Sequence, residues 1–140
     1  MITDRSRVQV LQPPGWAAPK GYANGVAASG LQVFVAGQIG WNAQCQFESD
    51  DLVEQVRQAL SNVRDVLAQA GAAPEHITRM TWYLVNKQDY LQRAREIGRV
   101  YRDIVGVYSV AMTAVQVTAL MEDRALVEIE VTAVIPGERA

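Results

Sequence analysis

Near the C-terminus, apolar and polar residues alternate over two runs, residues 112–118 and residues 126–134. Such alternation is typical of β-strands that bury one face. In the second run Glu128 points away from the apolar face, because successive side chains of a strand point to opposite faces. A polar link at residues 122–124 predicts that the two runs form a C-terminal hairpin, with Met112 on the same face as Glu128.

Apolar residues also indicate strands in the N-terminal part of the chain. Residues 22–28 and 31–39 flank a two-residue link that contains Gly30, which is typical of a hairpin turn. The second segment is apolar on both faces over most of its length, apart from Gln38, which predicts a central strand. Residues 8–11 predict a further short strand.

Two longer segments show the spacing of three and four residues that is typical of amphipathic helices. The first covers about residues 51–70; a polar loop before it supplies N-cap residues, and Gly71 ends it. The second covers residues 87–105, with Asn86 as its N-cap. Residues 78–85 are rich in aromatic and β-branched side chains and predict a strand between the two helices.

The order of these elements predicts an α+β fold with a βαβαβ core, N- and C-terminal hairpins, and a mixed β-sheet with two helices packed on one face. Two helices cover only one face, whereas the strands around Val35 and Trp82 are apolar on both. The other face must therefore be buried. A cyclic homo-oligomer buries it symmetrically; the alternative is a monomer whose second face is a ligand-binding trough.

Length and charge limit the classes of function. A chain of 140 residues with 49% hydrophobic residues predicts a single domain over residues 1–140. The net charge of −2 and a pI near 5.4 disfavour nucleic-acid binding, which usually requires a basic stripe. The N-terminus lacks the apolar core of a signal peptide, and no run approaches the roughly 18 apolar residues of a membrane span. We therefore expect a soluble cytoplasmic protein with no nucleic-acid or membrane partner.

The single cysteine and the single histidine of the chain do not indicate a catalytic or metal site. The only cysteine, Cys45, cannot form an internal disulfide, and with the only histidine, His76, it cannot build a metal cluster at any usual ligand spacing. Both are interpreted as residues without a catalytic role. Trp16 lies on a loop rich in proline, where it either caps an apolar cleft or anchors the loop.

Four parts of the chain occur in an order and spacing that is more specific than any of them alone. They are residues 19–26, residues 33–39, the helix positions Gln58, Asn62, Val63, Ala70 and Gly71, and residues 127–134. Together they resemble the RidA/YjgF family of reactive-intermediate imine deaminases. The resemblance implies a chorismate-mutase-like fold and a homotrimer with small-molecule clefts at its subunit interfaces. Family members hydrolyse enamines and imines such as 2-aminoacrylate to 2-oxo acids and ammonia, without metal or organic cofactor.

The resemblance also implies site residues. Glu128, the first glutamate of a Glu-Ile-Glu motif, is expected to be catalytic by positioning water or accepting a proton, whereas Glu130 is expected to be structural. Tyr22 matches a tyrosine of the cleft wall, and Asn24 stands where many members have glutamine. Gln38 is assigned either to a hydrogen bond with the backbone, which is favoured, or to contact with the ligand.

One position departs from the family. Its members use an arginine, in a Pro-Ala-Arg motif, to hold the substrate carboxylate, and here Met112 occupies that position. A thioether cannot make the bidentate, charge-assisted contact that a carboxylate requires. Met112 is then expected to form an apolar wall of the cleft. The substrate would instead be anchored by a cation of a neighbouring subunit, with Lys20, Arg79 and Arg124 as the candidates.

Three functions of different classes follow from these observations. A divergent enamine or imine hydrolase with an atypical substrate is favoured. A non-catalytic trimer that binds a small molecule is the alternative that the loss of the arginine permits. A ribonuclease or translation inhibitor is disfavoured by the acidic pI.

Overall fold

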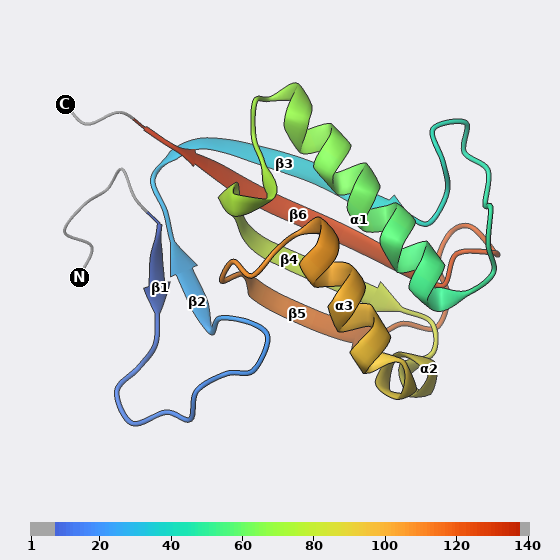
Figure 1. Ribbon diagram of the computed structural model, residues 1–140, viewed down its shortest axis with the longest axis horizontal. Coiled ribbons are helices and arrows are strands. Elements are labelled where there is room, and N and C mark those ends of the chain that lie inside the picture. Colours follow the sequence, from blue (N-terminus) through green and yellow to red (C-terminus); the bar gives the residue numbers. More distant parts are fainter. Residues whose placement is uncertain (1–7, 138–140) are drawn as a thin grey trace.

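The computed structural model describes residues 8–137, which form a β-sheet with helices on one side (Figure 1). The four-stranded sheet has the order β3 (Gly30–Ile39), β6 (Val127–Pro136), β4 (Ile77–Leu84), β5 (Ala111–Gln116). The helices are α1 (Leu52–Gln69), α2 (Lys87–Gln92) and α3 (Ala94–Ile104), and a 3₁₀ turn covers Pro74–His76. A two-stranded sheet pairs β1 (Gln9–Leu11) with β2 (Gly25–Ala27). Residues 1–7, for which the sequence predicts no signal peptide, lie outside the described residues.

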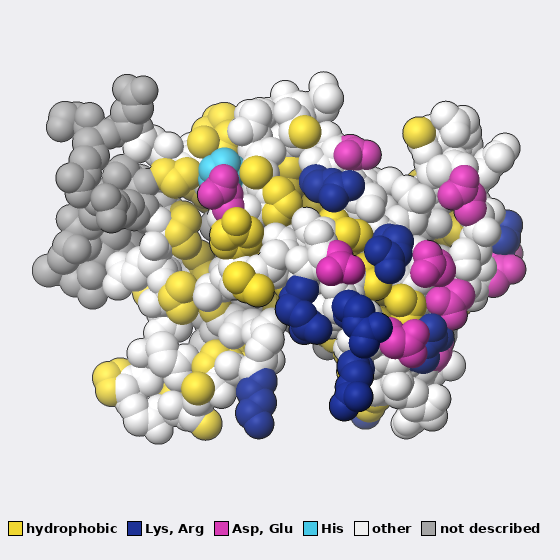
Figure 2. Space-filling model, viewed as in Figure 1, with side chains coloured by type: hydrophobic (Ala, Val, Ile, Leu, Met, Phe, Trp, Pro, Cys, Tyr) yellow, Lys and Arg dark blue, Asp and Glu magenta, His cyan; other side chains and the backbone are white. Residues whose placement is uncertain are grey.

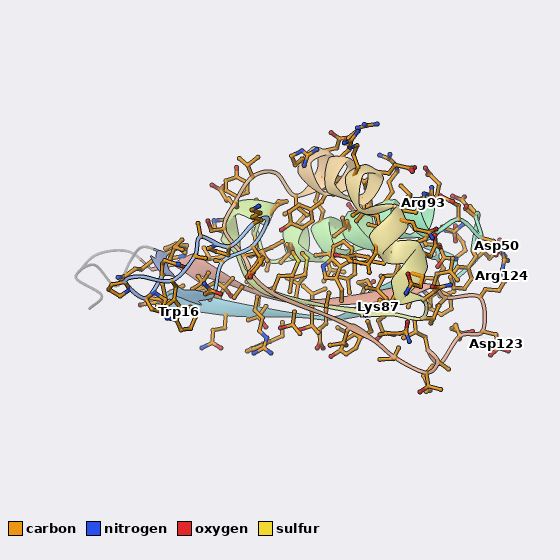
Figure 3. The ribbon with its side chains drawn as sticks, turned by 90° about the horizontal axis from the view of Figure 1, so that it is seen from below. Trp16, Asp50, Lys87, Arg93, Asp123 and Arg124 are labelled. Carbon is orange, nitrogen blue, oxygen red and sulfur yellow. The ribbon has the colours of Figure 1, made fainter. Side chains whose placement is uncertain are left out.

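The predicted α+β class and its mixed sheet are confirmed. Strand β6 runs antiparallel to β3 and β4, and β4 runs parallel to β5. All three helices lie on one face of the sheet, and the opposite face is uncovered (Figure 3). The core between the layers contains side chains that are almost fully buried, among them Leu60, Leu67, Met80, Trp82 and Ile129.

Helix α1 follows the sequence pattern closely. Asp51 is its N-cap, and its carboxylate accepts a hydrogen bond from the backbone N–H of Glu54 at 3.2 Å. Gly71 adopts φ 72° beyond the C-terminus, a conformation that favours glycine. The predicted start and stop of this helix are therefore confirmed.

The second predicted helix is two helices, which corrects the sequence interpretation. The chain turns at Arg93, whose φ and ψ of −102° and 14° leave the helical range. From this turn its guanidinium donates to Asp51 at 2.9 Å and to Glu96 at 2.9 Å, so it joins the start of α1 to α3. These hydrogen bonds lower the pKa of both carboxyl groups and raise that of Arg93. The predicted N-cap of α2 is confirmed, because the Asn86 side chain accepts from the backbone of Asp89.

Both predicted hairpins are wrong in their pairing. Strand β5 pairs with β4 and not with β6, because the crossover through α2 and α3 carries the chain to the parallel position beside β4. Strand β2 pairs with β1 across a long loop, whereas β3 pairs with β6. Gly30 does adopt a positive φ of 149°, and a Cβ there would overlap the carbonyl of Ile135.

Strand β3 is an edge strand of the sheet and not a central one, which also corrects the sequence interpretation. Its apolar residues lie on two faces: Val35 is buried under the helices, whereas Phe34 is 71% exposed. Phe34 lies opposite Thr132 of β6 on the uncovered face. The apolar character of both faces therefore reflects an uncovered surface rather than a position inside the sheet of one chain.

The helices also bear on membrane insertion. Within residues 8–137 none has both the length and the apolar character that crossing a bilayer requires.

Candidate functional site

A cleft of about 680 Å³ opens on the helical side, between the N-terminal loop, α3 and strand β5. Figure 2 shows this side of the molecule hollowed at its lower edge, with Lys and Arg side chains on both sides of the hollow. The residues that line the cleft are Lys20, Gly21, Tyr22, Trp82, Tyr90, Ala94, Ile97, Gly98, Tyr101, Arg102, Gly106, Val107, Tyr108, Ser109, Met112 and Ala114.

Three aromatic side chains pack together in this cleft. The Trp82 ring lies 6.2 Å from that of Tyr90, edge to face, and 6.3 Å from that of Tyr101. Burial raises the pKa of the Tyr90 hydroxyl, and it raises the pKa of Tyr101 to about 12, so both are protonated donors at neutral pH. The buried indole N–H of Trp82 has no hydrogen-bond partner among the described residues.

Two of the residues expected to bind substrate lie together in the cleft. Tyr22 reaches it from the N-terminal loop, and Met112 reaches it from β5. Met112 is partly buried and packs against the hydrophobic core, as expected for an apolar wall.

Glu128 is not part of this cleft, which corrects the prediction that it shares a face with Met112. Met112 lies opposite Met80, under the helices, whereas Glu128 lies opposite Tyr83 on the uncovered face. Adjacent residues of β4 alternate between the faces, so the sheet separates the two side chains. The apolar residues of β5 do not mark its buried face, because Val115 is 41% exposed on the uncovered side.

The uncovered face carries its own polar group. Gly37 sits at a β-bulge of β3, and a Cβ at this position would overlap the Glu128 carboxylate, so only glycine leaves that carboxylate room. The Tyr83 hydroxyl donates to Glu130 at 2.6 Å, and this hydrogen bond, with burial and the nearby negative charges, raises the pKa of Tyr83. The Glu128 side chain makes no hydrogen bond or ion pair with another described residue.

Asn24 and Gln38 make structural contacts and lie outside the cleft. The Asn24 amide donates to Gln12 within the N-terminal loop at 2.9 Å. The Gln38 amide donates to the carbonyl of Ala36 at 3.0 Å, across the bulge. Trp16 is 62% exposed and lines a second, shallower hollow beside Asn24.

The three candidate anchors for a carboxylate lie in different places. Lys20 lines the cleft. Arg79 lies on the uncovered face, beside Phe34 and Glu130. Arg124 binds Asp50 at 2.9 Å, and Figure 3 places this pair at the end of the molecule away from Trp16.

Sequence reasoning missed several residues of the cleft. Tyr90, Tyr101 and Arg102 line it, and the sequence analysis identifies none of them as site residues. The available signal was the concentration of tyrosines on one helical face with Trp82 on the neighbouring strand, a pattern that the core explains equally well. The role of Gly37 depends on a bulge that periodicity does not reveal.

Comparisons with known proteins find relatives over most of the chain. The sequence matches the family described as Endoribonuclease L-PSP over residues 15–135. A RutC family protein of Aquifex aeolicus is 31% identical over 126 residues, which cover 89% of this chain and 97% of that protein.

Solved structures show the same fold. The Rid family protein YyfB of Yersinia pestis is similar with a TM-score of 0.81 and 31% identity, covering 91% of this chain and 98% of that one. E. coli TdcF, solved with bound serine, is similar with a TM-score of 0.65 and 27% identity, covering 90% of this chain and 98% of that one.

Proposed function

Because this chain belongs to the Endoribonuclease L-PSP family, with the YjgF and Rid proteins, we propose that it hydrolyses a small enamine or imine to a carbonyl compound and ammonia. The observation that supports this most is the placement of Glu128. Its carboxylate stands over Gly37 without a hydrogen bond to another described residue, which leaves it available to hold a water molecule.

The site is proposed to form between subunits. Glu128 and the Tyr22–Met112 cleft lie on opposite sides of one sheet, so a single chain does not bring them together. The uncovered face exposes large apolar side chains such as Phe34, which favours contact with another copy. We propose a homotrimer in which Glu128 of one copy completes the cleft of the next.

The proposed reaction needs only water and a proton carrier. Water adds to the carbon of the protonated C=N bond while Glu128 accepts one of its protons, which gives a neutral carbinolamine. Glu128 returns that proton to the nitrogen, and as the C–N bond breaks the hydroxyl proton passes to solvent, so that ammonia and the carbonyl compound are released. A positioned acid/base group typically accelerates such steps by about 10² to 10⁴-fold.

The activity is tested with imines generated in situ from a panel of amino acids by an amino-acid oxidase. We expect the protein to raise ammonia release from at least one imine by about tenfold or more over spontaneous hydrolysis. Semicarbazide, which traps the free imine, should correspondingly form less semicarbazone. Unchanged rates across aliphatic, aromatic and charged imines would contradict the proposed activity.

A non-catalytic binding trimer is the second candidate, and Met112 is the observation that favours it. The position where the family holds a carboxylate has no charge here. Ligands that raise the melting temperature without being turned over would support this function instead.

A further inference from the structure

The dimensions of the cleft point to a ligand larger than a three-carbon imino acid. Its volume of about 680 Å³ lies within the range of about 300 to 1,000 Å³ typical of pockets that enclose drug-sized molecules. A ligand that fills it contacts β4, α3 and β5 together.

The walls suit a flat apolar group. Trp82, Tyr90 and Tyr101 present three rings with centroid spacings of 6.2 and 6.3 Å, and Met112 adds a polarisable thioether. Aromatic rings favour edge-to-face and offset contacts with a further ring, and a thioether packs well against one. Trp82 itself is 2% exposed and lies behind the two tyrosines.

The charge of the cleft has one sign. Lys20 and Arg102 line it, and no aspartate or glutamate among residues 8–137 does. Neither cation forms an ion pair with another described residue. The Arg102 guanidinium lies beside Gly98, one turn earlier on α3, where a Cβ would meet it at 3.4 Å.

From these observations we propose that the cleft binds a planar aromatic molecule that carries an anionic group. The ring packs against Tyr90, Tyr101 and Met112, and the anion lies between Lys20 and Arg102. The anionic anchor has thus moved from position 112 to the opposite wall of the cleft. This inference rests on the same cleft as the proposed function and names its ligand class, but it requires binding only.

Calorimetry with four simple probes tests the two parts of the ligand separately. Phenylacetate carries ring and carboxylate, phenylacetamide carries the ring without charge, acetate carries the charge without a ring, and phenyl phosphate replaces the carboxylate. We expect phenylacetate or phenyl phosphate to bind about tenfold or more tightly than phenylacetamide and acetate at low salt. The tighter of the two identifies the anion as a carboxylate or a phosphate.

Variants locate the anion. Arg102→Gln and Lys20→Gln should each weaken binding of the preferred anion by about fivefold or more and leave phenylacetamide unchanged. Arg99→Gln is the matched control, because Arg99 lies on the same helix but does not line the cleft. Equal binding of phenylacetate and phenylacetamide, or equal losses in Arg99→Gln and Arg102→Gln, would overturn the inference. Absent binding of all aromatic anions together with turnover of small aliphatic imines would overturn it and leave the proposed activity standing.

Discussion

Glu128→Gln is expected to lower the rate of imine hydrolysis by roughly 10²-fold or more, the usual scale for a positioned acid/base group. The substitution keeps the size of the side chain but removes the negative charge that orients water and accepts its proton. The fold of the subunit should be unchanged, because the Glu128 side chain makes no hydrogen bond or ion pair within the described part of its own chain. The rate is measured as ammonia released from the imine that the wild-type protein prefers.

Glu130→Gln is the matched control. Glu130 lies on the same strand and face, but it accepts a hydrogen bond from Tyr83. Its loss should change turnover much less than the loss of Glu128. Small and equal effects in both variants would show that the two carboxylates are only solvent-facing side chains of the strand and that neither takes part in catalysis.

The Met112→Arg variant is expected to hydrolyse 2-iminopropanoate, the tautomer of 2-aminoacrylate, with a kcat/KM roughly 10 to 100-fold above the wild type. A charge-assisted hydrogen bond contributes about 1.5 to 3 kcal/mol, and each 1.36 kcal/mol is about tenfold in rate. At position 112 the wild type offers only dispersion from the thioether, so it should hydrolyse this substrate poorly. Pyruvate formation, coupled to lactate dehydrogenase, measures both proteins.

Met112→Leu is the control for side-chain volume. It should hydrolyse 2-iminopropanoate as poorly as the wild type does. Because Met112 packs against the core, the mass and melting temperature of each variant need to match the wild type. A wild-type rate already equal to that of a typical family deaminase would mean that position 112 does not hold the carboxylate. An inactive but correctly assembled Met112→Arg protein would favour the binding function.

Local elements of the fold were predictable because they depend on neighbouring residues. The N-cap Asp51, the stop at Gly71 and the buried stripe of α1 all follow from spacings of a few residues. The turn at Arg93 was missed because it depends on Asp51, which is distant in the sequence.

Strand pairing was not predictable from alternation. Met112 and Val115 are both apolar, so the pattern of β5 permits either face to be buried. Only its parallel pairing with β4 decides the question, and this depends on the crossover. The wrong hairpin pairing also gave a wrong prediction for the site, because it placed Met112 beside Glu128 within one chain.

Family resemblance supplied Tyr22 and Met112, which the structure brings into one cleft, but not the surroundings that make this cleft distinct. Arg102 is solvent-exposed and resembles other arginines of α3 in sequence. Its place at the cleft depends on the packing of α3 beside β5. The proximity of Gly37 to the Glu128 carboxylate likewise depends on the β-bulge of β3.

Mixed oligomers test most directly whether Glu128 completes the cleft of a neighbouring copy. Glu128→Gln leaves the cleft intact, and Ala114→Trp fills the cleft but keeps Glu128. Each variant alone should be inactive, with a mass near three times 15.4 kDa by light scattering. Refolded together in equal amounts, they should recover about a quarter of the wild-type activity, since random mixing pairs an open cleft with a neighbour's Glu128 in about that fraction of sites. Mixed trimers that stay inactive, or particles near 15.4 kDa, would contradict the account.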